Sequence, residues 1–176
     1  MKSKILKFEL IGAFFIIFLG SLLHFTFEWS AKFWLVGIFS AVNESTWEHL
    51  KLAVIPALLW MLIETKILKE KPKSFFFAKT KGIYSMLFFI VLFFYSYKAI
   101  LGKDLLILDI LTFIIAVILG QLISYKMMFW ENLPEIYNKI AIVFLLLLFF
   151  SFVIFTFYPP HHFFFQDPIT LKYGIE

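Results

Sequence analysis

Long apolar stretches separated by short polar segments dominate the chain. Each stretch is close to the roughly 20 helical residues that are needed to cross about 30 Å of hydrocarbon. Lysines and turn-forming residues stand between the stretches, as is typical of the ends of membrane-spanning helices. The pattern predicts five spans, at about residues 5–27, 45–68, 82–100, 105–128 and 136–157.

Two features blur the limits of these spans. Phe75, Phe76 and Phe77 extend the third stretch toward the N-terminus, but Lys79 and Lys81 favour a start nearer residue 82. The segment 29–42 is only partly apolar and too short to cross, so we expect it to lie at the membrane interface or to re-enter partly. Its aromatic residues would anchor it there.

The C-terminal segment, residues 158–176, forms a tail with its own signals. Pro159 and Pro160 end the fifth span, and Asp167 with Pro168 marks a turn. The run 163–165 consists of three phenylalanines, which is too apolar to extend freely into water. We therefore expect the tail to fold back onto the bundle.

Composition excludes a water-soluble globular protein. Of 176 residues, 62% are hydrophobic and 16% charged, whereas soluble domains have about half apolar and about a quarter charged residues. The absence of cysteine excludes disulfides and thiolate metal sites. We see no internal repeat or polar linker. The sequence thus predicts one all-α domain over residues 1–176, an integral membrane helical bundle with lipids as its surroundings.

The basic residues indicate orientation rather than nucleic-acid binding. All 16 are lysines, and they flank apolar spans instead of covering a polar domain. Eleven lie on the side of the N-terminus, so the positive-inside rule predicts a cytoplasmic N-terminus and an external C-terminus. These eleven are Lys2, Lys4, Lys7, Lys66, Lys69, Lys71, Lys73, Lys79, Lys81, Lys126 and Lys139.

The four histidines all fall on the predicted outer side. His24 and Glu28 are four residues apart and share a face of the first span. Glu44 and the Glu48–His49 pair offer a similar face at the start of the second span. We expect these two faces to meet and surround an ion or a polar substrate.

Structural roles for the same residues stay open. Ser45 and Glu48 have the spacing of a capping box, in which both side chains bind free amides at a helix start. His24 and Glu28 could simply pair with each other. Lys51 lies one turn inside the second span, where it could extend to the surface or pair with Glu48 or Glu28.

Further polar residues could enlarge the site. Asp109 lies either inside the outer half of the fourth span or at the interface, depending on where that span begins. His161 in the tail could cover the site as a lid or third ligand, unless the phenylalanine run merely anchors the tail. The wider polar site comprises Asn43, Lys51, Asp109 and Asp167.

The leading functional hypothesis is a metal-binding membrane enzyme, hydrolase-like, acting at the outer leaflet. Its divalent ion, zinc first, would be held by imidazoles and a carboxylate, with Glu48 as general base and Glu44 as ligand or catalytic group. No HExxH motif is present. Binding or transport of a solute or lipid without chemistry, and a role in membrane assembly, are the alternatives. The predicted metal ligands are His24, Glu28, His49 and His161.

Three segments of the chain resemble a family of small multipass bacterial membrane proteins known only as a domain of unknown function. They are HFTFEW at 24–29, VNESTWEHLKL at 42–52, and PPH at 159–161 followed by a DPxTxxYG pattern at 167–174. The resemblance implies a bacterial cytoplasmic membrane and a shared outward-facing cluster, but no activity. His162 departs from it where an aliphatic residue is expected, and so does Leu171, where glycine would suit the turn better.

Overall fold

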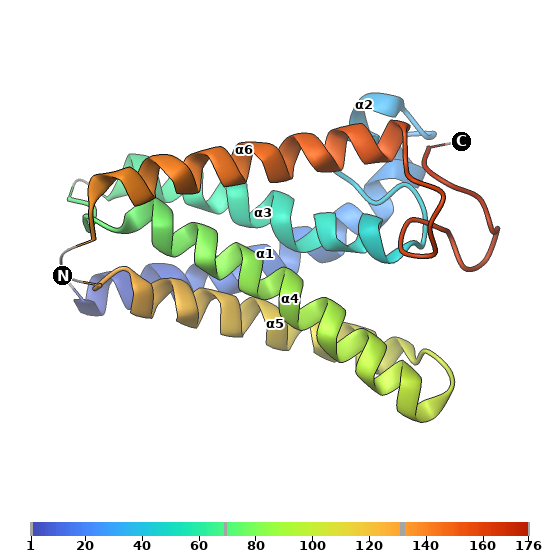
Figure 1. Cartoon of the computed structure of the whole chain (residues 1–176), viewed down its shortest axis with the longest axis horizontal. Helices are drawn as coiled ribbons and strands as arrows, with labels where there is room; N and C mark the ends of the chain where they lie inside the picture. The colour runs from blue at the N-terminus through green and yellow to red at the C-terminus, as the bar shows by residue number, and fades with distance from the viewer. Residues whose placement is uncertain (1, 69, 131–132, 176) are drawn as a thin grey trace.

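The computed structural model describes residues 2–68, 70–130 and 133–175 and consists of six helices and a C-terminal tail (Figure 1). Within that part of the chain, the predicted all-α architecture is confirmed, and the only strand-like pairing is an isolated bridge between Gln166 and Tyr173. The helices are α1 (Lys2–Trp29), α2 (Trp34–Gly37), α3 (Thr46–Ile67), α4 (Phe75–Leu101), α5 (Leu106–Met127) and α6 (Glu135–Phe157).

The five long helices run along the same axis, and the short α2 lies in the connector between α1 and α3 (Figure 1). α3 is central and packs against α1, α4 and α6, while α4 and α5 form an extended hairpin. We call the end where α1 begins the N-terminal end. The opposite end, which carries α2 and the tail, is the tail end.

Helices α1, α4, α5 and α6 are long and apolar enough to cross a membrane. Large apolar side chains such as Phe14, Phe18 and Leu147 are exposed on them, as expected of surfaces that face lipid. The central helix α3 differs, because it carries the charged residues Glu48, Lys51 and Glu64, and all three are buried. The other helices therefore enclose the polar groups of the bundle.

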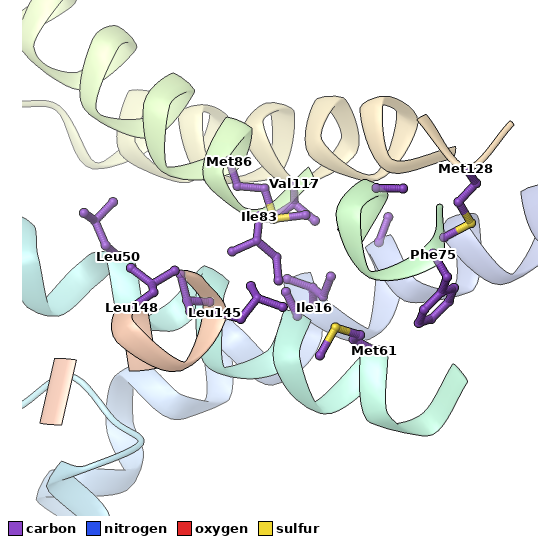
Figure 2. Packing of buried hydrophobic residues seen from close by; sticks show 14 of the residues in the cluster. Ile16, Leu50, Met61, Phe75, Ile83, Met86, Val117, Met128, Leu145 and Leu148 are labelled. Atoms are coloured by element: carbon purple, nitrogen blue, oxygen red, sulfur yellow. The ribbon is translucent and has the colours of Figure 1, made fainter. Parts of the chain in front are cut away.

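Side chains from all five long helices form the apolar core (Figure 2). Ile16 of α1 and Met61 of α3 lie beside Ile83 and Met86 of α4, and Val117 of α5 completes this layer. Leu145 and Leu148 of α6 extend the cluster toward Leu50 at the tail end. The core thus separates the two ends of the bundle with apolar side chains.

Glycines bring the helix backbones close together at two crossings. A Cβ added at Gly82 of α4 would lie 2.7 Å from the carbonyl oxygen of Gly120 of α5, so a side chain cannot be accommodated there without movement. A Cβ added at Gly20 of α1 would lie still closer, 2.3 Å, to the carbonyl oxygen of Leu52. That carbonyl receives no bond from Pro56 four residues on, because proline lacks an N–H. Small residues allow the close helix approach that is common in membrane bundles.

The tail folds back over the tail end, and backbone hydrogen bonds hold it. Phe164 O accepts from Trp47 N at 3.1 Å, and Thr156 O accepts from Ile175 N at 3.0 Å. The indole of Trp47 packs among four phenylalanines from α6 and the tail. Leu171 adopts a left-handed conformation with φ of 61°, a position that favours glycine.

Candidate metal centre

Three ionisable side chains converge at the tail end of the bundle. His24 comes from the last part of α1, His49 from the first turn of α3, and Glu44 from the connector just before α3. The two Nε2 atoms are 3.3 Å apart, and Glu44 Oε2 lies 3.4 Å from His49 Nε2 and 3.9 Å from His24 Nε2. These three residues form the triad discussed below, and they could hold one metal ion.

The start of α3 positions two members of the triad. Ser45 is the N-cap residue, and its hydroxyl accepts a hydrogen bond from Glu48 N at 3.3 Å, as the capping motif predicts. Asn43 shapes the preceding turn, because its Oδ1 accepts from Ser45 N and its Nδ2 donates to Gly174 O in the tail. The connector that carries Glu44 is thereby tied both to the helix and to the tail.

A backbone contact orients the imidazole of His49. Its Nδ1 lies 3.0 Å from the carbonyl oxygen of Ser45, one turn earlier. A carbonyl oxygen can only accept, so Nδ1 carries a proton, and in the neutral imidazole the lone pair of Nε2 then points toward His24 and Glu44. Histidines that bind metals characteristically donate their other ring N–H to such a carbonyl.

The triad is accessible to solvent. About a third of each imidazole side chain is exposed, 34% for His24 and 33% for His49, and 43% of the Glu44 side chain is exposed. An ion could therefore enter without opening the bundle. The side chains nevertheless remain close to one another because two helices fix the histidines.

The structure places the other two predicted ligands outside this triad. Glu28 pairs with Lys32 at 3.5 Å on the exposed end of α1, one turn beyond His24. His161 stacks on Tyr173 within the tail, with ring centroids 4.6 Å apart. In the part of the chain that the structure describes, the grouped ligands are thus two histidines and Glu44 rather than the larger predicted set.

Two members of the predicted wider polar site form local contacts instead. Asp109, in the first turn of α5, accepts a hydrogen bond from the Tyr97 hydroxyl of α4. Asp167 stabilises the turn in the tail, where its Oδ1 accepts from Ile169 N at 2.7 Å and from Thr170 N at 3.3 Å. Each carboxylate therefore has a hydrogen-bond partner within the protein and does not need an external ligand.

Glu48 and Lys51 form a fully buried ion pair beneath the triad, with Nζ and Oε2 2.5 Å apart. Glu48 also accepts from Val42 N at 3.1 Å and from the Thr156 hydroxyl at 3.0 Å. Lys51 donates to Gly37 O and Thr156, both at 2.8 Å. Pairing with Glu48 was one of the three alternatives that the sequence left open for Lys51. The contribution of Thr156 was not predicted, because no local pattern distinguishes this threonine.

A second buried ionic cluster lies near the N-terminal end and was not predicted as a site. Lys79 of α4 contacts Glu9 of α1 at 2.7 Å and also pairs with Glu64 of α3. The sequence analysis counts Lys79 only as one of the lysines on the side of the N-terminus. Glu9 carried the missed signal, because a carboxylate within an apolar run is costly unless it is paired or used.

Burial of Lys79 and Lys51 removes one lysine from each side of the orientation count. Lysines remain in excess on the side of the N-terminus, since most of the other lysines lie there. The positive-inside argument therefore does not depend on either buried lysine.

Comparison with known proteins identifies a family without an assigned activity. Searches of curated proteins and of solved structures each found no match. Residues 1–175, nearly the whole chain, match a family described as a family of unknown function (DUF6512). This match confirms the resemblance to an uncharacterised family that the sequence segments had indicated. The chain belongs to the DUF6512 family.

Proposed function

We propose that this chain is an integral membrane protein that binds one divalent transition-metal ion, zinc in the first instance, at the triad of His24, Glu44 and His49. The orientation of His49 carries the proposal, because its Nδ1 donates to Ser45 O and so leaves Nε2 free to bind a metal. If His49 only stabilised the start of α3, its Nε2 would not need to face a second histidine and a carboxylate.

The spacing of the three ligand atoms supports zinc. Zinc bonds of about 2.0–2.2 Å in a tetrahedron separate neighbouring ligand atoms by about 3.3–3.6 Å. Two of the three separations, 3.3 Å and 3.4 Å, fall in that range. The third, 3.9 Å between His24 and Glu44, requires a small movement of the half-exposed Glu44 side chain. Two histidines and one glutamate leave a fourth position for water or substrate.

Binding an ion requires one change of protonation at His24. Without a metal, the contact between the two Nε2 atoms is a single N–H···N hydrogen bond, in which His24 donates because His49 Nε2 is unprotonated. A metal takes the place of that proton, and His24 then carries its proton on Nδ1. The existing contact therefore holds both rings at the separation that the ion needs.

The distribution of the lysines supports an outer-face location for the proposed site. With the N-terminus in the cytoplasm, the tail end of the bundle and the triad face the outside of the cytoplasmic membrane of a bacterial host. The site would then take its ion from the external medium or from the headgroup region of the outer leaflet.

Glu48 is held in place by its neighbours and takes no part in the proposed metal site. Both carboxylate oxygens of Glu48 are engaged by Lys51, Val42 and Thr156, so this residue is not free to act as the predicted general base. Hydrolysis of a lipid-linked substrate at the open metal position stays a prediction from sequence. Glu44 is assigned here as a ligand.

Metal titration of the detergent-purified protein tests the proposal. After chelator treatment, we expect equilibrium dialysis followed by elemental analysis to give one zinc per chain, and cobalt to give the visible spectrum of a tetrahedral site. His24→Ala and His49→Ala should each lose the bound metal. His161→Ala is the matched control, because it removes a histidine from the same end of the protein outside the triad.

The folding of each variant is checked by size-exclusion profile and thermal stability. The proposal is wrong if the wild-type protein binds neither zinc nor cobalt. It is equally wrong if well-folded His24→Ala and His49→Ala proteins bind as much metal as the His161→Ala control.

A further inference from the structure

The buried cluster of Glu9, Glu64 and Lys79 has more acidic than basic groups. The three side chains are 1%, 0% and 3% exposed and come from α1, α3 and α4. Lys79 Nζ lies 2.7 Å from Glu9 Oε1 and pairs with Glu64 Oε2 on its other side. One ammonium group therefore serves two carboxylates.

Neutral groups from α5 and α3 complete the surroundings of the cluster. Ser124 donates to Glu9 Oε1 at 3.1 Å, and Gln121 donates to the backbone carbonyl of Glu9 at 3.2 Å. The indole of Trp60 lies beside Glu64. The ring of Phe75 lies 5.9 Å from Lys79 Nζ. No other charged residue is paired with this cluster in the part of the chain that the structure describes.

One oxygen of each carboxylate is left unsatisfied. Glu9 Oε2 and Glu64 Oε1 are buried and meet no hydrogen-bond partner among the described residues. Buried carboxylate oxygens without a partner are rare in proteins, since each forfeits its hydration without compensation. Glu9 Oε2 therefore indicates a missing donor that neither helix packing nor Lys79 supplies, whereas Glu64 has the indole N–H of Trp60 beside it.

Charge balance identifies the missing donor. With all three groups ionised the cluster has a surplus negative charge, and an unpaired charge buried away from water is strongly unfavourable. Two carboxylates held on one nitrogen also repel each other, which favours protonation of one of them over double ionisation. A metal cation is the less suitable ligand, because the Lys79 ammonium already occupies the position between the two carboxylates.

We propose that the Glu9–Glu64–Lys79 cluster is a proton-binding site that holds one additional proton on one of its two carboxyl groups. Lys79 keeps its own charge, and the bound proton makes the cluster neutral. The proton exchanges with solvent at the N-terminal end, where the cluster lies close to the ends of α3 and α5. Toward the tail end, the apolar core around Ile16, Met86 and Val117 separates it from the other ionic groups.

The Glu48–Lys51 pair provides an internal comparison. It is as deeply buried, but it has one carboxylate for one ammonium, and both oxygens of Glu48 have partners. It is already neutral and needs no additional proton. The two buried sites thus differ in charge balance, because only the Glu9–Glu64–Lys79 cluster has more carboxylates than ammonium groups.

Infrared spectroscopy of the full-length protein in an ester-free detergent tests the proposal. At neutral pH we expect the C=O stretching band of a protonated carboxyl group, shifted by exchange into D₂O. Glu9→Gln and Glu64→Gln should each abolish this band, because either change leaves one carboxylate for one ammonium. Glu28→Gln, which removes an exposed carboxylate outside the cluster, is the control and should retain the band. Glutamine has the shape of a protonated glutamate, so both test variants are expected to fold.

Two outcomes would overturn the proposal. The first is a wild-type protein without the acid band at neutral pH, in which case a rise in thermal stability with sodium or potassium, compared with choline, would identify a metal cation as the ligand. The second is a band that survives in well-folded Glu9→Gln and Glu64→Gln proteins alike. Neither result depends on zinc, so this test is independent of the proposed metal centre.

Discussion

Glu48 and His49 are consecutive residues of α3 that face different surroundings. The Glu48 carboxylate is buried against Lys51, while the His49 imidazole is a third exposed and lies 3.3 Å from His24. Successive helical residues point about 100° apart, since a turn has 3.6 residues. One short stretch of sequence therefore contributes to a structural ion pair inside the bundle and to a candidate site at its surface.

The identity of the carboxylate ligand can be tested by a pair of matched variants. Glu44→Gln should weaken zinc binding by about tenfold or more, because it removes the oxygen ligand of the triad. Glu28→Gln should leave zinc affinity unchanged, because Glu28 pairs with Lys32 instead. Isothermal titration calorimetry measures both. Equal losses in the two variants would contradict the ligand set that the structure indicates.

Metal binding should weaken as the pH falls. Protons compete with the metal for His24 Nε2 and His49 Nε2, and only the neutral imidazole binds an ion. Zinc affinity should therefore decline steadily as the pH is lowered. Equilibrium dialysis at a series of pH values checks this expectation. An affinity that stays constant across the series would exclude histidine ligands.

Removing one member of the Glu48–Lys51 pair should strongly destabilise the protein. Glu48→Leu leaves the Lys51 ammonium buried without its counter-charge, which costs about 3–5 kcal/mol. The double change Glu48→Leu with Lys51→Met should recover most of this loss, because no charge is then buried. Unfolding free energies in mixed detergent micelles provide the measurement.

An exposed ion pair serves as the control for that experiment. Glu28 and Lys32 are more than half exposed, so Glu28→Ala should change stability by less than about 1 kcal/mol. A double variant of Glu48 and Lys51 that is no more stable than Glu48→Leu alone would show that packing, not charge, dominates at this site.

The α4–α5 hairpin should depend on its two facing glycines. Gly82→Leu places a side chain against the backbone of Gly120, and we expect a loss of about 1–3 kcal/mol from overpacking. Phe88→Leu, at an exposed position of the same helix, is the control and should be nearly neutral. Thermal unfolding in detergent distinguishes them, and similar melting temperatures would contradict a tight crossing.

The left-handed residue of the tail offers a stabilising change. Leu171 has φ of 61°, which costs a residue with a side chain about 1 kcal/mol relative to glycine. Leu171→Gly should therefore raise the melting temperature slightly. Gly174→Ala should lower it, because Gly174 also has a positive φ and its Cβ would lie 2.8 Å from Thr156 O. A destabilised Leu171→Gly protein would contradict the tail conformation.

Sequence alone determined the class of the protein and the outline of its bundle. The length of the apolar stretches is enough to predict helices, because a membrane requires every backbone amide to be satisfied within its own segment. The N-cap role of Ser45 was likewise readable, since it depends on neighbouring residues. At Leu171, where the family resemblance favoured glycine, the backbone is left-handed. The convergence of His24 and His49 followed from placing the ends of two helices on the same side.

Only the tertiary structure decided which polar groups meet. His24 lies beside Glu44 rather than Glu28. This contact depends on the path of the connector between α1 and α3, which no short sequence pattern encodes. The grouping of Glu9 with Glu64 and Lys79 joins residues from three helices. Such groupings depend on how the helices are rotated and where they cross. Packing of the whole core sets this arrangement, whereas the local sequence pattern determines only that each helix forms.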